Sequence, residues 1–273
     1  MRDLFNLKDK TALITGAAGL LGYEHAVALM SVSCNLVLVD INKSKLILTK
    51  KKLLNFKKKI KILTYVVDIT DEKALNTLVQ KLKKNKIFVE ILINNAALDP
   101  KMNNLEKKSG TVEKYDVKYL REEIDVGLIG AFLCAKVFGN EMSKRKKGII
   151  INIASDLAIL APDQRVYSKT GKISDVLNFK PIGYPIVKAG MLGLNRYLAT
   201  YWAHKGIRVN CLVPGAVKNK QSKKLLKEIA NRVPMSRLAR KDEYRGAIIF
   251  LSSKASSYMT GQLLIMDGGR SIW

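Results

Sequence analysis

Two side chains with the capacity for proton transfer stand four positions apart in the stretch Tyr184-Pro185-Ile186-Val187-Lys188. Pro185 fits the first position of a helix, because the N–H that it lacks would have no partner there. A residue before proline is pushed out of the α region, so we expect Tyr184 at the mouth of the helix and Lys188 about one turn further along. An ammonium close to the phenol favours the phenolate and would lower the pKa of Tyr184 toward the range of a general acid or base.

A tyrosine and a lysine at this spacing occur by chance in any lysine-rich chain, but a glycine-rich turn near the N-terminus gives the pair a context. The turn, Thr15-Gly16-Ala17-Ala18-Gly19-Leu20-Leu21-Gly22, lies between a predicted buried strand over 10–15 and a predicted apolar helix over 20–31. Small residues let the backbone approach a pyrophosphate, and a helix N-terminus supplies N–H groups and the positive end of a dipole. This pattern predicts a dinucleotide site whose contacts are Gly16, Gly19, Leu20, Leu21 and Gly22.

An acidic residue ends the next predicted strand, 35–40. Asp40 stands at about the 20-residue spacing of a carboxylate that accepts hydrogen bonds from the ribose of a dinucleotide. An acid at this position repels a 2′-phosphate, so we expect NAD(H) in preference to NADP(H). The alternative interpretation is a tight connection between strand and helix that binds no ligand.

The rest of the chain alternates between predicted strands and helices. Further strands are expected over 60–67, 88–93, 148–154, 207–212 and 262–266. Further helices are expected over 43–59, 71–84, 119–144, 184–204 and 242–252. This alternation predicts an α/β fold, a single doubly wound Rossmann domain over 1–273 with a central parallel sheet of about seven strands and helices on both faces.

Two longer segments interrupt the alternation, a basic inserted loop over about 156–183 and a basic flap over about 216–240. Long loops in compact domains commonly act as lids or binding loops. The inserted loop therefore supplies the candidate substrate contacts, which are Asp156, Gln164, Arg165 and Tyr167.

The charge of the chain is strongly positive, with 48 lysines and arginines against 23 acidic residues in 273 positions, a net charge of +25. One interpretation is a nucleic-acid binder. The other is a lysine-rich composition spread over helix faces, and we favour it because the lysine runs are scattered and carry no interleaved aromatic residues. The positive field would also attract phosphorylated substrates.

Cysteine usage and hydropathy bound the compartment. Cys34, Cys134 and Cys211 are widely spaced in apolar runs, which indicates reduced core thiols with neither a disulfide framework nor a metal site. No apolar stretch is long enough to span a bilayer, and the N-terminus lacks the apolar region of a secretory signal. We expect a cytoplasmic protein without a metal cofactor.

Taken together, the landmarks resemble the short-chain dehydrogenase/reductase family over essentially the whole chain. In the family's order they are Thr15-Gly16 to Gly22, Asp40, Asp68, Asn94-Asn95-Ala96, Ser155, Tyr184 with Lys188, Pro214-Gly215 and Asp267-Gly268-Gly269. The resemblance implies that Tyr184 exchanges the proton, that Lys188 binds the nicotinamide ribose and tunes the phenol, and that Ser155 orients the substrate oxygen. It also implies cofactor contacts at Ile41, Asp68, Ile69, Asn94, Ala96, Pro214, Gly215 and Val217, besides Tyr184 and Lys188.

Three departures from the family pattern stand out. The glycine turn has the Gly-x-x-Gly-x-x-Gly spacing of the larger sugar-nucleotide epimerases and dehydratases. Gly127 stands where the compact members have an asparagine, so water or another side chain would have to replace the asparagine-mediated proton relay. Ser155 and Tyr184 are 29 positions apart, further than usual. Tyr167 is nearer the usual spacing but has no lysine four residues on, so it is a decoy or a substrate contact.

Within the family, the segments 94–101, 162–165 and 258–261 look like the oxidoreductases of flagellin modification and surface polysaccharides, linked to legionaminic-type amino-sugar pathways. This implies an NAD(H)-dependent enzyme that acts on the hydroxyl of a phosphorylated or nucleotide-linked sugar and forms a homodimer or homotetramer. Two alternatives stay open. One is a sugar-nucleotide epimerase or dehydratase that recycles its NAD, although only 85 residues follow Lys188. The other is a non-catalytic nucleotide sensor or nucleic-acid binder.

Overall fold

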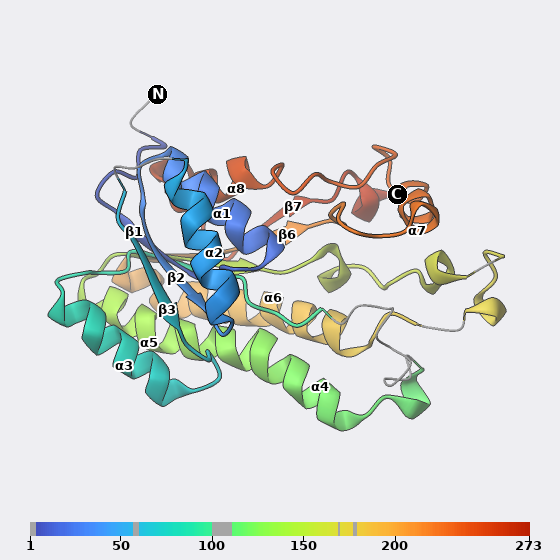
Figure 1. The fold of residues 1–273 in the computed structure, drawn as a ribbon, viewed down its shortest axis with the longest axis horizontal. Helices are drawn as coiled ribbons and strands as arrows, with labels where there is room; N and C mark the ends of the chain where they lie inside the picture. The colour runs from blue at the N-terminus through green and yellow to red at the C-terminus, as the bar shows by residue number, and fades with distance from the viewer. Residues whose placement is uncertain (1–3, 57–59, 100–110, 169, 177–178) are drawn as a thin grey trace.

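Seven apolar runs form one parallel sheet in the computed structural model, which describes residues 4–56, 60–99, 111–168, 170–176 and 179–273. The strands are β1 (Thr11–Thr15), β2 (Asn35–Asp40), β3 (Ile62–Val66), β4 (Ile91–Asn94), β5 (Gly148–Ile153), β6 (Ile207–Pro214) and β7 (Leu263–Met266). Their order is β3-β2-β1-β4-β5-β6-β7, and every neighbouring pair is parallel (Figure 1). The chain thus builds outward from β1 in one direction and then from β4 in the other, which makes the carboxyl ends of β1 and β4 the topological switch point.

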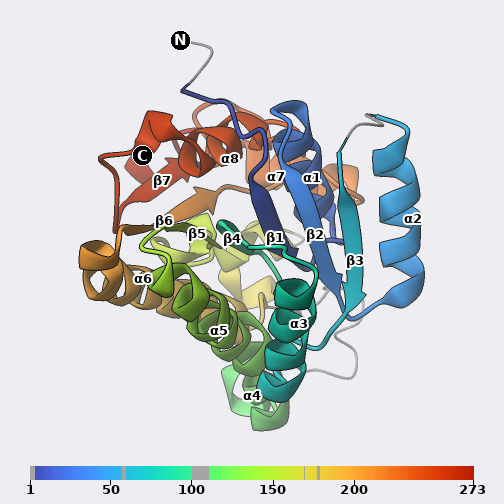
Figure 2. The same cartoon turned by 90° about the vertical axis from the view of Figure 1, so that its left-hand side faces the viewer.

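Helices cover both faces of the sheet. They are α1 (Leu20–Ser31), α2 (Lys43–Leu54), α3 (Glu72–Lys84), α4 (Val117–Ile124), α5 (Gly130–Lys144), α6 (Gly183–Trp202), α7 (Lys223–Ala230) and α8 (Arg245–Ser252). Buried side chains of α1, α2 and α8 form the core on one face, and those of α3, α5 and α6 form the core on the other (Figure 2). The predicted doubly wound Rossmann domain is confirmed. None of the helices in the described part of the chain is long and apolar enough to cross a membrane.

The strands are apolar on both sides because each lies between two helical layers. Leu13 and Ile14 of β1 point to opposite cores, and both are fully buried. Burying a side chain of this size stabilises the fold by about 1.5–3 kcal/mol, so the central strands hold the sheet edge rigidly in place. A rigid edge is what positions the polar residues that follow each strand.

Polar caps explain where several helices begin. Asn42 accepts a hydrogen bond from the N–H of Lys45 at the start of α2, and Asp71 accepts from Lys73 and Ala74 at the start of α3. Such caps satisfy N–H groups that have no partner within the helix. The predicted helix over 20–31 and the strand over 35–40 have the bounds that the structure gives them. The predicted helix over 43–59 ends earlier, at Leu54, and its last positions, 57–59, lie outside the described residues.

The predicted helix over 119–144 is more complex than expected. It begins at Val117, where Asp116 is the cap, and its α-helical hydrogen bonding is interrupted by a π-helical turn over Asp125–Ile129 before α5 continues. Single π turns of this kind are frequent at functional sites. Here the turn carries Gly127.

Tyr184 lies at the mouth of its helix as expected, but the prediction that Pro185 takes the first helical position is wrong. Helix α6 begins at Gly183, so Tyr184 and Pro185 both lie inside its first turn. Proline is tolerated there because the first N–H groups of a helix have no intrahelical partner, and this holds beyond the first position. Lys188 still follows Tyr184 by about one turn.

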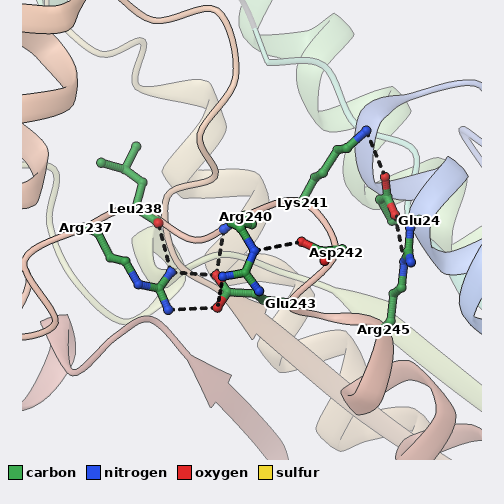
Figure 3. Close-up of polar contacts among 8 residues, drawn as sticks. All are labelled: Glu24, Arg237, Leu238, Arg240, Lys241, Asp242, Glu243 and Arg245. Carbon is green, nitrogen blue, oxygen red and sulfur yellow. Dashed lines mark hydrogen bonds and ion pairs between the residues drawn. The ribbon is translucent and has the colours of Figure 1, made fainter.

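The flap (216–240) is closed at its base and tied to the rest of the fold. Val217 and Ala239 pair as an isolated parallel bridge, so the two ends of the flap lie side by side. The segment that follows is fixed by ion pairs, which Figure 3 shows. In α1, Glu24 contacts Lys241 at 3.4 Å and is also held by Arg245, whose Nε donates at 2.8 Å.

Candidate active site

The glycine turn lies at the carboxyl end of β1 and leaves no room for larger residues. Gly16 has a left-handed backbone (φ 60°), and a Cβ added to it would lie 2.8 Å from the Cα of Ala96. A Cβ on Gly22 would lie 2.3 Å from the carbonyl oxygen of Gly16. Gly19 is the N-cap of α1 and makes no side-chain cap. The first turn of α1, which carries Leu20 and Leu21, therefore presents its N–H groups at the sheet edge as an anion cradle.

Asp40 borders this cradle. Its Oδ2 accepts the N–H of Ala18 at 2.9 Å, and its Oδ1 accepts the N–H of Asn42 at 2.9 Å. The neighbouring Ile41 is exposed. The carboxylate is held at the end of β2 beside the glycine turn, as a ribose-binding acid requires.

The next two predicted contacts follow β3 and differ in exposure. Asp68 is exposed, and its Oδ1 accepts hydrogen bonds from both the N–H and the hydroxyl of Thr70. Ile69 is buried, and its side chain packs against Gly130 at the start of α5. Asp68 can therefore contact a ligand at the sheet edge, while Ile69 supports the wall behind it.

The two asparagines after β4 have different partners. Asn94 is buried and donates to the side chain of Asn152 at 2.9 Å and to the carbonyl of Ala131 at 3.3 Å. Asn95 donates to the carbonyls of Thr15 and Gly16, at 3.0 and 3.1 Å. The motif therefore ties the end of β4 both to the helical layer and to the glycine turn. Sequence reasoning missed the role of Asn95, for which its place beside Asn94 was the only signal.

Ser155, directly after β5, contacts the phenol of Tyr184 from α6. The hydroxyl of Ser155 donates to Oδ1 of Asp156 at 2.8 Å and accepts the N–H of Leu157 at 3.2 Å. Burial raises the pKa of Tyr184, and the negative charge of Asp99 raises it further, while the hydrogen bond with Ser155 lowers it. The phenol is thus neutral at neutral pH.

Lys188 lies on the buried side of α6. Its Nζ donates to the carbonyl of Ile153 at 2.7 Å and lies 5.6 Å from the centre of the Tyr184 ring. Burial lowers the pKa of Lys188 to about 8. The expectation that Lys188 lowers the pKa of Tyr184 in this state is wrong, because desolvation of the phenol dominates and the ammonium is directed at a backbone carbonyl.

The π turn carries Gly127 at the position where the family has an asparagine, and packing there leaves no room for a side chain. A Cβ on Gly127 would lie 2.4 Å from Cγ1 of Val187, the residue before Lys188. The side chain of Val187 thus fills the place that a side chain at 127 would take. A proton relay through that position has no room in this chain.

Three of the predicted substrate contacts form hydrogen bonds or ion pairs within the protein; they are Asp156, Gln164 and Arg165. Asp156 is buried and forms an ion pair with Arg270 at 2.6 Å. Gln164 accepts the backbone N–H of Lys180 at 2.8 Å. Arg165 is exposed and pairs with Asp163, whose other oxygen accepts from Arg232 of the flap at 2.6 Å.

Tyr167 is half-buried near the same charges as Tyr184. Burial raises the pKa of Tyr167 to about 12, and the charges of Asp99, Arg270 and Asp156 act on it as well. Tyr167 therefore lies near the same acidic residues as Tyr184, the predicted catalytic tyrosine. Its predicted role as a substrate contact stays a prediction.

A second lysine beside Tyr184 was missed by sequence reasoning. The Nζ of Lys180 lies 4.3 Å from the centre of the Tyr184 ring and pairs with Asp99 at 2.5 Å. Arg270, the partner of Asp156, was missed as well. No motif or spacing connects either pair, since the partners are 81 and 114 positions apart.

The last predicted cofactor contacts lie between β6 and the flap. A Cβ on Gly215 would lie 2.7 Å from the Cα of Asp267, and the N–H of Gly215 donates to Met266 at the end of β7. Pro214 ends β6, and Val217 stands at the base of the flap. The strand end and the flap base therefore meet at the same edge as the glycine turn.

Comparison with known proteins decides the family. A family model described as enoyl-(acyl carrier protein) reductase, of the adh_short_C2 type, matches residues 16–271. This chain belongs to the short-chain dehydrogenase/reductase family. It is thus an oxidoreductase with a nicotinamide cofactor, as the sequence predicted.

Relatives of this short-chain dehydrogenase/reductase include enzymes named for sugar acids and polyols. It is 30% identical to 2-dehydro-3-deoxy-D-gluconate 5-dehydrogenase of Formosa agariphila, over 98% of this chain and 94% of the relative. It is 28% identical to galactitol 2-dehydrogenase (L-tagatose-forming) of Cereibacter sphaeroides, over 100% and 99%.

A solved structure confirms the fold. The gluconate 5-dehydrogenase of Burkholderia cenocepacia, in complex with NADP and tartrate, superposes with a TM-score of 0.85 over 100% of this chain and 99% of that one, at 24% identity. The predicted kinship with flagellin-modification and legionaminic-type enzymes stays a prediction.

Proposed function

We propose that the chain is an NAD(H)-dependent oxidoreductase that interconverts a hydroxyl and a carbonyl on an anionic carbohydrate derivative. The observation that carries the proposal is the contact of Ser155 with the buried phenol of Tyr184, with Lys188 one turn away. Serine, tyrosine and lysine in this arrangement can hold a substrate oxygen, exchange its proton and tune that exchange.

The edge of the sheet fits a dinucleotide. The left-handed Gly16, the start of α1 and the fixed carboxylate of Asp40 form a cradle. Its turn is too tight for a Cβ on Gly16 or Gly22, because either would clash with neighbouring backbone atoms. We assign the pyrophosphate to Gly16, Gly19 and the residues 20–22, and the adenosine to Asp40, Ile41 and Asp68. The nicotinamide half falls to Asn94, Ala96, Tyr184, Lys188 and the segment 214–217. When bound, the nicotinamide accepts or supplies the hydride of the reaction.

Tyr184 works as the acid in reduction. Since burial raises its pKa, the phenol keeps its proton at neutral pH and can donate it to a carbonyl oxygen. In oxidation the phenol must first lose that proton, so oxidation is expected to quicken as the pH rises. The hydroxyl of Ser155 donates to Asp156 and accepts the N–H of Leu157, which leaves one lone pair to accept from a substrate hydroxyl.

Lys188 can pass the proton on. With a pKa of about 8, its ammonium gives up or takes up a proton near physiological pH. Because Val187 occupies the space beside Gly127, we assign the exit of the proton to the ribose hydroxyls and water in place of a side chain at 127.

The proposed substrate is an anionic carbohydrate. The basic residues of the inserted loop favour an anionic carbohydrate, and the sugar-acid relatives support this class. A phosphorylated or nucleotide-linked sugar of surface-glycan or flagellin-modification pathways belongs to the same chemical class. Asp40 supports NAD(H) over NADP(H).

We also propose a homodimer or homotetramer in the cytoplasm. Tyr197 and Tyr201 stack on each other on the exposed side of α6, and Phe132 of α5 is also exposed. Exposed aromatic residues of this kind favour contact with another subunit.

The proposal is tested with the substitution Tyr184→Phe. We expect turnover of a sugar acid with NAD to fall by about 10²- to 10⁴-fold, the usual value of a positioned general acid, while the affinity for NADH changes little. Turnover is followed by NADH absorbance and affinity by fluorescence titration. Tyr197→Phe, on the exposed side of the same helix, is the matched control. Retained turnover in Tyr184→Phe would contradict the assignment.

A further inference from the structure

Among the described residues of the inserted loop, Lys180 places its ammonium beside the ring of Tyr184, the proposed catalytic residue. Its Nζ lies 4.3 Å from the centre of the Tyr184 ring, nearer than the Nζ of Lys188 at 5.6 Å. The reaction described above assigns no role to Lys180. A buried cation beside the reacting phenol therefore needs an explanation.

Lys180 is held at two points. Its backbone N–H donates to Oε1 of Gln164 at 2.8 Å, and its ammonium donates to Oδ1 of Asp99 at 2.5 Å. The ammonium is thus fixed between the inserted loop and the segment that follows β4. Both segments lie at the carboxyl edge of the sheet, where the substrate must enter.

The two members of the ion pair differ in exposure. The side chain of Lys180 is 12% exposed, whereas that of Asp99 is 63% exposed. Much of the desolvation of the ammonium is already in place in the folded protein, so a second anion would meet a poorly hydrated cation. The exposed carboxylate of Asp99 can return to water easily, because exposed ion pairs are weak.

We propose that Lys180 binds the anionic group of the substrate, and that Asp99 occupies the ammonium until this group displaces it. The inference rests on the oxidoreductase function proposed above. Because the ammonium lies against the ring of Tyr184, the anionic group must stand within a few bonds of the reacting carbon. A carboxylate and a phosphate share this chemistry, and a neutral polyol lacks it.

The pair is also coupled electrostatically to Lys188. The charges that act on Lys188 are Cys211 of β6, Asp99 and Lys180. Lys180 lowers the pKa of Lys188, and Asp99 raises it. Removing the charge of Lys180 should therefore raise the pKa of Lys188.

The test compares anionic and neutral probes of similar length in the full-length enzyme with NAD. The probes are D-gluconate, galactitol 6-phosphate and galactitol, and the variants are Lys180→Met and Lys180→Arg. Lys172→Met, exposed in the same loop, is the matched control. We expect Lys180→Met to reduce the gluconate-to-galactitol ratio of kcat/KM by about 10- to 100-fold, mainly through KM, as the loss of one hydrogen bond to a charged group predicts. Lys180→Arg should keep most of the ratio, and Lys172→Met should leave it within about twofold.

Calorimetric titration of each probe into the enzyme–NADH complex separates this inference from the proposed function. If no sugar is oxidised, the proposed function is contradicted. The calorimetric affinities then still test whether Lys180 binds the anionic group. Tighter binding of either anion than of galactitol, lost in Lys180→Met, supports the inference, and the preferred anion tells carboxylate from phosphate. Anions that bind no tighter than galactitol, or equally well to Lys180→Met, overturn it.

Discussion

At the residue scale, we expect Asp40 to decide between the two nicotinamide cofactors. Its carboxylate is fixed by the N–H groups of Ala18 and Asn42, so it cannot turn away from a 2′-phosphate without breaking both hydrogen bonds. We expect Asp40→Ser to lower the NAD-to-NADP ratio of kcat/KM by about 10- to 100-fold, because a charge-assisted hydrogen bond to the ribose is lost and a repulsion is relieved. Steady-state rates with the two cofactors measure this ratio.

The control for Asp40 is Asp116→Ser, which exchanges one N-cap for another at the start of α4. The ratio should not move in that variant. An unchanged ratio in Asp40→Ser would assign cofactor selection to other residues.

Single residues with a fixed motif spacing could be predicted from the sequence, and the pairs around them could not. Ser155 and Tyr184 were placed together by the resemblance to the family, although they are 29 positions apart. The partners Lys180 with Asp99 and Arg270 with Asp156 meet only because loops of irregular path cross the sheet edge. Periodicity contains no information on such paths, so the charges that set the pKa of Tyr184 were predicted incorrectly.

At the element scale, the π turn and α6 fit together through one glycine. The methyl group of Val187 occupies the space of a side chain at 127. We expect Gly127→Asn to destabilise the protein by about 1–3 kcal/mol through overpacking, and to lower Tm by several degrees. Adding Val187→Ala should recover most of that loss, since it removes the clashing methyl groups.

Thermal unfolding of the two single variants and the double variant forms a double-mutant cycle. A favourable coupling energy is expected between positions 127 and 187. Strictly additive effects would show that the two residues do not compete for the same space.

The helix that carries Gly127 also shows what local sequence leaves undetermined. Its apolar periodicity predicts one continuous helix over 119–144, and the chain is indeed helical throughout. The extra residue of the π turn depends on how closely α6 approaches, which is a property of packing between distant segments. The start of α6 was misplaced for a related reason, because Pro185 is compatible with more than one position of a first turn.

At the scale of the whole molecule, a buried histidine makes folding sensitive to acid. His25 of α1 is fully buried, and burial lowers its pKa from 6.5 to about 3. Between pH 6.5 and about pH 3, His25 is protonated in the unfolded chain and neutral in the folded chain. The free energy of unfolding therefore falls as the pH drops through this range. The expected slope from this residue is about 1.4 kcal/mol per pH unit.

His25→Leu should flatten this acid limb, because the apolar side chain takes no proton. Urea unfolding of both proteins at pH 7, 6, 5 and 4 gives the two slopes. His204→Leu, at an exposed position, should keep the slope of the original protein. Parallel slopes for the original protein and His25→Leu would show that other groups cause the acid sensitivity.

The doubly wound parallel sheet was the most predictable property of the molecule. Each crossover returns through a helix of ordinary length, which leaves a parallel, doubly wound sheet as the economical arrangement of seven apolar runs. The net charge of +25 was the least informative property, since the lysine runs are scattered along the sequence and indicate no single ligand.

The ion pairs of Glu24 have a mechanical consequence (Figure 3). They clamp the base of the flap to α1, the helix whose start is the proposed pyrophosphate site, while Val217 and Ala239 pair the two ends of the flap. Any movement of the flap is therefore expected in its outer part, which includes α7 and is joined to the inserted loop by Arg232 and Asp163. We expect such a movement to leave the proposed dinucleotide site unchanged.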